Sequence, residues 1–201
     1  MKYILTLLLL CTACTEHTPQ QKNTSVKTDT LKAAAVDFVR LHVDSVRQLQ
    51  LLNKDGSTWK TIVYDDNFAD SSIVPYAMKP ENLLLIFRCL GQENGLYKVV
   101  VQEDKHMTKY ISCKDRHFVP ETQQENIINA CCVGFDEKNN PMREQPSLQA
   151  KQVPMDPDTD DLNATIKIEG DWLLIQRDRA EGWIKWRDEK GKLLIEIFYD
   201  A

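Results

Sequence analysis

The feature that most constrains the fold is a pair of short apolar runs joined by a charged turn, between positions 169 and 186. This stretch reads E-G-D-W-L-L-I-Q-R-D-R-A-E-G-W-I-K-W, so a Gly precedes a Trp in each half. Successive side chains of a strand point to opposite faces, so the pattern predicts a tight β-hairpin with one buried face. We expect the side chains that face inward to be Leu173, Ile175, Ile184 and Trp186. The side chains of the outer set are those of Trp172, Leu174 and Trp183.

Similar short runs recur upstream, with turn signals between them. Asp55-Gly56 and the segment G-Q-E-N-G at 91–95 each separate two β-prone runs. Residues 31–46 mix helical and strand spacing, and we expect a short helical turn followed by a strand. Many short strands with turns between them predict an all-β fold of small barrels or a sandwich. The expected strands cover 47–52, 58–64, 83–90, 96–102 and 109–112.

The C-terminal part resembles the bacterial SH3 domain over residues 127–201. The resemblance rests on Asn140, Arg143, Pro146 and Ser147, followed in the family's order by the runs G-D-W-L-L-I and G-W-I. It implies a small β-barrel closed by the run K-L-L-I-E-I-F-Y at 192–199. The connector at 149–162 departs from the family, because it is longer and more acidic and could cover a groove.

An upstream copy of the hairpin suggests a second, diverged barrel. Tyr97 aligns with Trp172, and Tyr110-Ile111 aligns with Trp183-Ile184, although any Gly-aromatic-apolar hairpin would look alike. The chain is therefore predicted to be all-β, with two small SH3-like β-barrels in tandem. The expected divisions are a signal peptide at 1–13, a lipidated tether at 14–30, a first barrel with an N-terminal extension at 31–123 and a second barrel at 124–201.

The N-terminus predicts export and lipid attachment. An apolar run at 3–10, too short to span a membrane, precedes Thr12-Ala13-Cys14. This resembles a bacterial lipobox, although Cys11 stands where the family has Leu, and it implies a lipid on Cys14. The alternative is an ordinary cleaved secretory peptide. Thr15 after the cysteine resembles the outer-membrane-sorted pattern, so we expect a lipid-anchored protein of the bacterial cell envelope, facing the periplasm or the surface.

Composition and motifs argue against nucleic-acid binding and catalysis. The formal net charge is -5 and no Lys/Arg cluster is present, so no nucleic-acid partner is expected. No histidine follows Cys132, as a cysteine peptidase would need, and no other catalytic motif occurs. The chain is predicted to be no enzyme and to need no cofactor.

An acidic loop and four cysteines are the remaining chemical features. Asp156, Asp158 and Asp160 alternate as in an EF-hand, but Asp161 and Lys167 replace the Gly and the closing Glu, so a solvated loop is favoured over a calcium site. Free buried thiols and disulfides are both open for the cysteines at 89, 113, 131 and 132. If a bridge exists, we expect it between positions 89 and 113, because adjacent residues 131 and 132 should point to opposite faces.

The SH3 resemblance implies a binding module for cell-wall peptide or for an extended segment of a partner protein. The membrane is then a partner through the lipid, and peptidoglycan or an envelope protein is the ligand. The alternatives are a structural subunit of an envelope assembly, and aromatic residues that only pack between the barrels. The candidate contacts are Trp172, Trp183, Tyr97, Tyr110 and Arg143.

Overall fold

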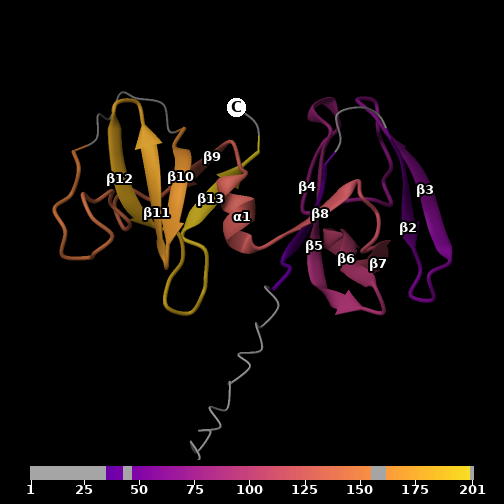
Figure 1. Cartoon of the computed structure of the whole chain (residues 1–201). Helices are drawn as coiled ribbons and strands as arrows, with labels where there is room; N and C mark the ends of the chain where they lie inside the picture. Colours follow the sequence, from indigo (N-terminus) through magenta and orange to yellow (C-terminus); the bar gives the residue numbers. More distant parts are fainter. Residues whose placement is uncertain (1–34, 43–46, 155–161, 200–201) are drawn as a thin grey trace, which may run out of the picture. The chain divides into compact units, whose positions relative to one another are not determined.

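The computed structural model describes residues 35–42, 47–154 and 162–199. Within these ranges the chain is all-β, with thirteen strands, one short α-helix and two single-turn 3-10 helices, Pro80–Asn82 and Glu103–Lys105 (Figure 1). The expected signal peptide, the tether and the lipid-bearing Cys14 lie outside the described residues.

Eight strands form the first sheet, which is antiparallel throughout. Their order is β3-β2-β7-β6-β5-β1-β8, and β4 pairs with β5 beside this path. The strands are β1 Phe38–Leu41, β2 Arg47–Leu52, β3 Thr58–Tyr64, β4 Ala77–Lys79, β5 Leu84–Glu93, β6 Leu96–Gln102, β7 Met107–Ser112 and β8 Phe118–Glu121.

Local turn chemistry sets the hairpins of this sheet. Gly56 adopts φ 83° between β2 and β3, and the Asp55 carboxylate accepts hydrogen bonds from the Ser57 backbone (3.0 Å) and hydroxyl (2.6 Å). Asn94 (φ 51°) and Gly95 (φ 75°) reverse the chain between β5 and β6. Both turns need the left-handed region that Gly and Asn tolerate, which confirms the predicted hairpins. β5 runs to position 93, so the second turn is shorter than expected.

The region before β2 contains the expected strand, β1, whereas residues 31–34 of the expected helical turn lie outside the described residues. β1 pairs with β5 and β8 on its two sides and buries Phe38, Val39 and Leu41. Residues 35–37, just before it, are irregular. Sheet pairing on both edges satisfies the backbone of this strand.

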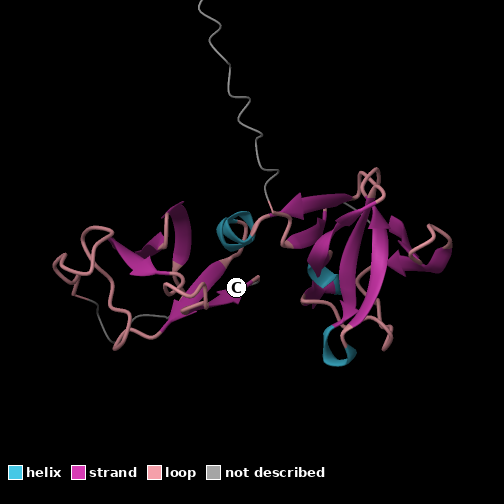
Figure 2. Ribbon diagram, turned by 90° about the horizontal axis from the view of Figure 1, so that it is seen from below, coloured by secondary structure: helices cyan, strands magenta, loops and turns pink. Residues whose placement is uncertain are grey.

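The C-terminal module, residues 123–199, contains one helix and two small sheets (Figure 2). β10-β11-β12 form one antiparallel sheet, and β13 pairs with β9 in the other. A capping box between Thr122 and Glu125 starts the helix. The elements are α1 Gln123–Ile128, β9 Cys132–Phe135, β10 Ala164–Glu169, β11 Trp172–Arg177, β12 Ala180–Lys185 and β13 Ile195–Phe198.

The hairpin at 169–186 is β11 and β12, and its buried face is the predicted one. All four residues of the predicted inward set are at most 1% exposed. They form a core with Ile127, Val133, Met142 and Ile195. Strand alternation therefore identified half of this core correctly.

The described sheets are open, which differs from the two closed barrels expected. The first sheet begins at β3 and ends at β8, and these end strands do not pair with each other. In the C-terminal module, one isolated bridge between Val133 and Asn163 joins β9 to the segment leading into β10. Strand pairing therefore does not continue from one sheet to the next. The whole segment between β9 and β10, residues 136–163, is called the connector from here on.

A buried polar cluster joins β8 to the start of the C-terminal module. The Glu121 carboxylate is buried and accepts hydrogen bonds from Arg40 Nε (2.7 Å), Asn126 Nδ2 (3.0 Å) and Asn129 Nδ2 (2.9 Å). Tyr199 donates to Asn126 Oδ1 at 2.6 Å. These bonds satisfy a carboxylate that would be costly to bury alone, and they fix α1 to the end of β8.

Candidate binding groove

The four predicted aromatic contacts belong to two different sheets. Tyr97 on β6 and Tyr110 on β7 are in the first sheet, whereas Trp172 on β11 and Trp183 on β12 are in the C-terminal module. Three of them are buried, with Tyr97 at 8%, Tyr110 at 6% and Trp183 at 8% exposed, and Trp172 is half-buried. They offer little surface to a ligand and do not form one cluster.

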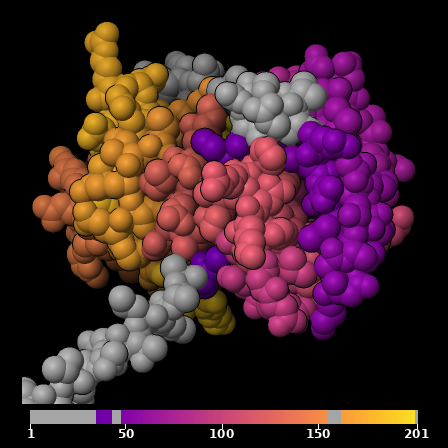
Figure 3. Space-filling view, turned by 45° about the vertical axis from the view of Figure 1, so that its right-hand side comes forward, coloured from indigo at the N-terminus to yellow at the C-terminus, as the bar shows by residue number. Residues whose placement is uncertain are grey.

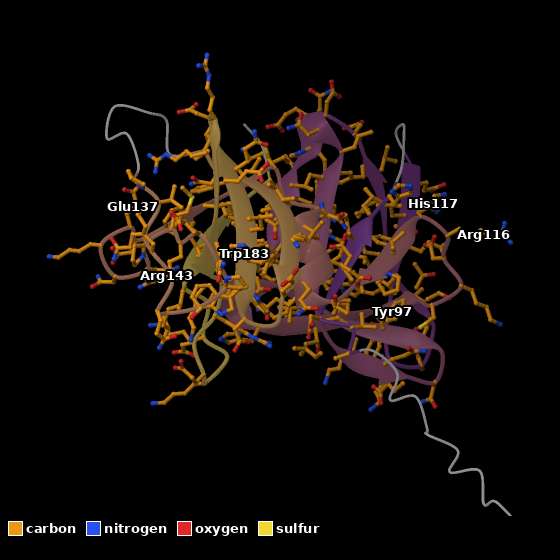
Figure 4. The ribbon with its side chains drawn as sticks, turned by 60° about the vertical axis from the view of Figure 1, so that its left-hand side comes forward. Tyr97, Arg116, His117, Glu137, Arg143 and Trp183 are labelled. Carbon is orange, nitrogen blue, oxygen red and sulfur yellow. The ribbon has the colours of Figure 1, made fainter. Side chains whose placement is uncertain are left out.

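Trp183 and Arg143 attach the connector to β12 (Figure 4). Their backbones exchange two hydrogen bonds, of 2.9 and 2.7 Å, and Arg143 Nη1 donates to the Ala150 carbonyl at 2.8 Å. Lys167 Nζ lies 5.0 Å from the centroid of the Trp183 ring and covers it. Both residues thus have a structural role that the sequence did not predict.

Gly182 is required for the same attachment. A Cβ atom at this position would lie 3.0 Å from the Arg143 carbonyl oxygen and would overlap the Met142 side chain. The Gly-Trp pair of the hairpin therefore reflects the close approach of the connector to β12.

The expected Cys89–Cys113 bridge is absent, and all four described cysteines are free. Cys89 lies on β5 and Cys113 follows β7, with β6 between these strands. Cys89 is opposite Val99, whereas the Cys113 N–H donates to the Gly95 carbonyl just before β6, so the two cysteines also lie at different positions along the sheet. Burial raises the pKa of both thiols, as expected for inert core cysteines.

A hollow of about 1040 Å³ opens in the C-terminal module beside β9 and β13. Its walls are formed by the end of β9 and the loop after it, by residues 162–163, by the end of β11 and by residues 193–198. The lining is mixed. Its apolar side chains are Phe135, Leu162, Leu193, Leu194, Ile195 and Phe198, and its polar or charged ones are Asp136, Glu137, Lys138, Asn163, Arg177 and Glu196. We call this hollow the groove.

An ion pair between a buried arginine and an exposed glutamate lies in the groove. Arg177 is 5% exposed, and its guanidinium donates to the carboxylate of Glu137, whose side chain is 45% exposed. A buried guanidinium must retain a counter-charge, so Glu137 holds the loop after β9 over the end of β11. Asn163 supports the same wall, because its Nδ2 donates to the Val133 carbonyl at 2.8 Å.

A second hollow of about 370 Å³ adjoins the groove at Glu137. Pro141, Val153 and Pro154 contribute to its lining. The two hollows together offer apolar surface on both sides of Glu137. This arrangement suits an extended ligand with apolar side chains and a few polar groups.

The lining of both hollows contains no histidine and no cysteine among the described residues. The chemical groups that the groove presents are carboxylates, the Lys138 ammonium, the Arg177 guanidinium and apolar side chains.

The described ranges contain neither a candidate metal site nor a candidate membrane-spanning helix. No group of three or more His, Cys, Asp or Glu residues in these ranges could hold a metal ion. The calcium candidate at Asp156, Asp158 and Asp160 lies outside them. No helix of the described chain is long and apolar enough to cross a membrane.

Sequence reasoning missed the groove, although one signal for it was present. Arg177 continues the inward series of Leu173 and Ile175, so alternation places a charged side chain in a buried position. Its partner Glu137 is 40 positions away and could not be identified from spacing. Comparison with known proteins adds no identification, because no family model, curated protein or solved structure matches this chain.

Proposed function

We propose that this protein is a membrane-tethered, non-enzymatic binding module of the bacterial cell envelope. The groove would take an extended segment of cell-wall peptide or of a partner protein. The observation that carries the proposal is a groove with apolar walls and an ion pair between the buried Arg177 and the partly exposed Glu137. The lipobox-like Cys14 supports the tether, and the polar stretch at 15–30 supports a flexible link between lipid and module.

The strand order of the C-terminal module supports an SH3-like relationship. A long loop follows β9, three consecutive antiparallel strands come next, and the last strand returns to pair with β9. Small barrels of this type bind extended segments in grooves lined by their loops. We propose this relationship for the C-terminal module, where the groove lies beside the long loop.

The groove suits an extended segment better than a compact ligand. Side chains of an extended chain alternate, so apolar ones can enter the groove while polar ones face solvent. The exposed fraction of Leu162 is 51%, which makes it an accessible apolar contact. Leu148 is similarly exposed, at 56%, but does not line the groove. These two leucines form a matched pair for an experiment.

The test is retention of the full-length protein, purified in detergent, on insoluble peptidoglycan and on immobilised envelope proteins. We expect Leu162→Asp to lower retention about tenfold, because a charge would enter an apolar contact of about 1.4 kcal/mol or more. Leu148→Asp should leave retention unchanged. Equal effects of the two substitutions, or none, would contradict binding in the groove.

A structural role in an envelope assembly is the second candidate, and the edges of the first sheet favour it. β3 and β8 end this sheet, and each carries an exposed valine, Val63 at 55% and Val119 at 40%. The purple β2 and β3 region lies along the right-hand side of the space-filling view (Figure 3). An exposed edge can pair with another chain. Retention of envelope proteins that is lost in Val63→Lys and kept in Leu162→Asp would favour this role.

A further inference from the structure

β13 forms one edge of the small sheet that it makes with β9. The two strands are antiparallel, and Ile197 is opposite Val133 in the register. The Val133 N–H donates to the Asn163 carbonyl at 2.9 Å and so points away from β13. Opposite residues of an antiparallel pair either bond to each other or both face away. The backbone groups of Ile197, and of Ile195 two positions earlier, therefore also point away from β9.

These outward-facing backbone groups of β13 are open to a new partner. Within the ranges that the structure describes, neither Ile195 nor Ile197 makes a hydrogen bond outside its pairing with β9. Their N–H and C=O groups lie two residues apart along one edge, which is the spacing that an extended main chain presents. An open edge of this kind accepts an added strand.

The outer face of β13 carries a carboxylate without a partner among the described residues. Glu196 is exposed and is opposite Gly134 in the register. A Cβ atom at Gly134 would lie 3.8 Å from the Glu196 Cβ and 3.1 Å from the Phe198 ring, so these three residues share one face. β9 therefore presents no side chain to Glu196, and no described cation pairs with it.

The charges of the groove favour a cation in its ligand. The lining carries three carboxylates and two cations, which leaves one negative charge in excess. Glu137 is bound to Arg177, and the Asp136 carboxylate accepts hydrogen bonds within its own turn, where Lys138 also lies. Glu196 is thus the one carboxylate of the lining that no described group binds. An opposite charge on the ligand would complement it.

We propose that the ligand is an extended segment of a partner protein, which joins β13 as an added antiparallel strand with a basic side chain opposite Glu196. Its backbone bonds to Ile195 and Ile197, and its basic residue forms an opposite-charge cross-strand pair. Leu194 and Phe198, two positions from Glu196 on either side, line the groove, so the ligand residues that meet them are apolar. The added strand presupposes the proposed function, because it is one way for an extended segment to occupy the groove.

A second copy of this chain fits the edge poorly. Two β13 strands paired about a two-fold axis centred on Glu196 would set two carboxylates directly opposite each other, and like charges in that position are destabilising. Ile195–Phe198 contains no basic residue that another register could bring opposite Glu196. The occupant is therefore a different segment, one that supplies the positive charge.

The first test uses a short capped peptide, the probe, in which threonine alternates with leucine, lysine and leucine in that order. Fluorescence anisotropy at low salt measures its binding to the full-length protein in detergent. We expect replacement of the probe's lysine by glutamate to weaken binding about fivefold, and Glu196→Lys to reverse this preference. Glu181→Lys, at an exposed strand position outside the groove lining, should keep the preference for lysine.

The charge test has two results that overturn the proposal. One is that the lysine probe does not bind the wild-type protein. The other is that the Glu196→Lys protein, shown to be folded by circular dichroism, still prefers the lysine probe.

Methylation of single amides of the probe tests the backbone pairing. In an antiparallel added strand, the two threonines beside the lysine point their N–H groups at β13, whereas the lysine N–H points away. Methylating either threonine amide should weaken binding about tenfold, and methylating the lysine amide should change it little. Equal effects at the two kinds of position would overturn pairing with the strand edge.

Hydrogen exchange separates the added strand from the groove itself. With the probe bound, the amides of Ile195 and Ile197 should exchange about tenfold more slowly, whereas those of Glu196 and Phe198, which face β9, should change little. Protection elsewhere in the groove but not at Ile195 and Ile197 would overturn the added strand and leave the proposed function standing. Loss of groove retention in Leu162→Asp tests the proposed function independently of the probe.

Discussion

The first sheet and the C-terminal module differ in how their strands are held together. In the first sheet, each strand from β3 to β8 pairs with the next one in the order, with β2 meeting β7 at the single pair Leu52 and Tyr110. In the C-terminal module, side chains replace part of the strand pairing. Asn140 shows this most clearly, since its Nδ2 donates to the Lys185 carbonyl (2.7 Å) and its Oδ1 accepts from the Lys185 N–H (3.0 Å).

The difference explains why the groove lies in the C-terminal module. Its two sheets meet through the Val133–Asn163 bridge rather than through a continuous ladder, so a hollow remains beside β9 and β13. Arg177 and Glu137 hold the loop over this hollow. The hairpin motif has a different role in each region. In the first sheet, its residue Tyr97 belongs to the buried core together with Cys89. In the C-terminal module, its residue Trp183 holds a loop through backbone hydrogen bonds.

The largest expected effect is in the continuous core of the first sheet. Phe87 is fully buried on β5, so Phe87→Ala should lower the free energy of unfolding by about 4 kcal/mol. Denaturant titration measures this loss. Leu90→Ala, at an exposed position of the same strand, is the control and should change little. A loss below about 1 kcal/mol for Phe87→Ala would contradict a tightly packed first core.

The next effect concerns the close approach of the connector to β12. Gly182→Ala places a methyl group against Met142 and the Arg143 carbonyl and should cost about 2–3 kcal/mol. Gly95→Ala meets no atom within 4 Å but has a positive φ, so it should cost only about 1 kcal/mol. Equal losses of stability for the two variants, measured by thermal unfolding, would show that the connector can move away to accept the added methyl group.

Much of the first sheet could be predicted from sequence because its signals are local. Asp55-Gly56 and Asn94-Gly95 fix turns through their own backbone preferences. In the C-terminal module, alternation likewise identified the buried face of β11. The groove could not be predicted, because Glu137 meets Arg177 across 40 positions. Helix α1 was also missed, although Thr122 and Glu125 had the spacing of a capping box.

A smaller effect tests whether Asn140 replaces strand pairing. Asn140→Ala removes both hydrogen bonds to Lys185 and should cost about 1–2 kcal/mol. Hydrogen exchange of the Lys185 amide should become faster, while amides of β5 and β6 keep their protection. Unchanged exchange at Lys185 would mean that the connector is held by its backbone contacts alone. Asn139→Ala, whose side chain reaches only Asp136, is the neighbouring control.

The smallest effect is a surface ion pair of the first sheet and depends on pH. Lys60 and Ser72 lower the pKa of Asp70 from 3.8 to about 2. Its stabilisation is therefore full above about pH 4 and is lost as the pH falls through about 2. Asp70→Asn should be slightly less stable than wild type at neutral pH and equal to it near pH 2. The measurement is chemical denaturation of wild type and Asp70→Asn over this pH range. A difference in the free energy of unfolding that stays constant with pH would show that Asp70 is unpaired.

The central claim is tested most directly by hydrogen exchange of the full-length protein. The exchange is measured with and without solubilised cell-wall peptide, and with and without envelope extract. Binding in the groove predicts added protection at 134–138, 162–163 and 193–198, with β2 and β3 unchanged. Protection confined to the first sheet, or none with either ligand source, would contradict the groove as the binding site.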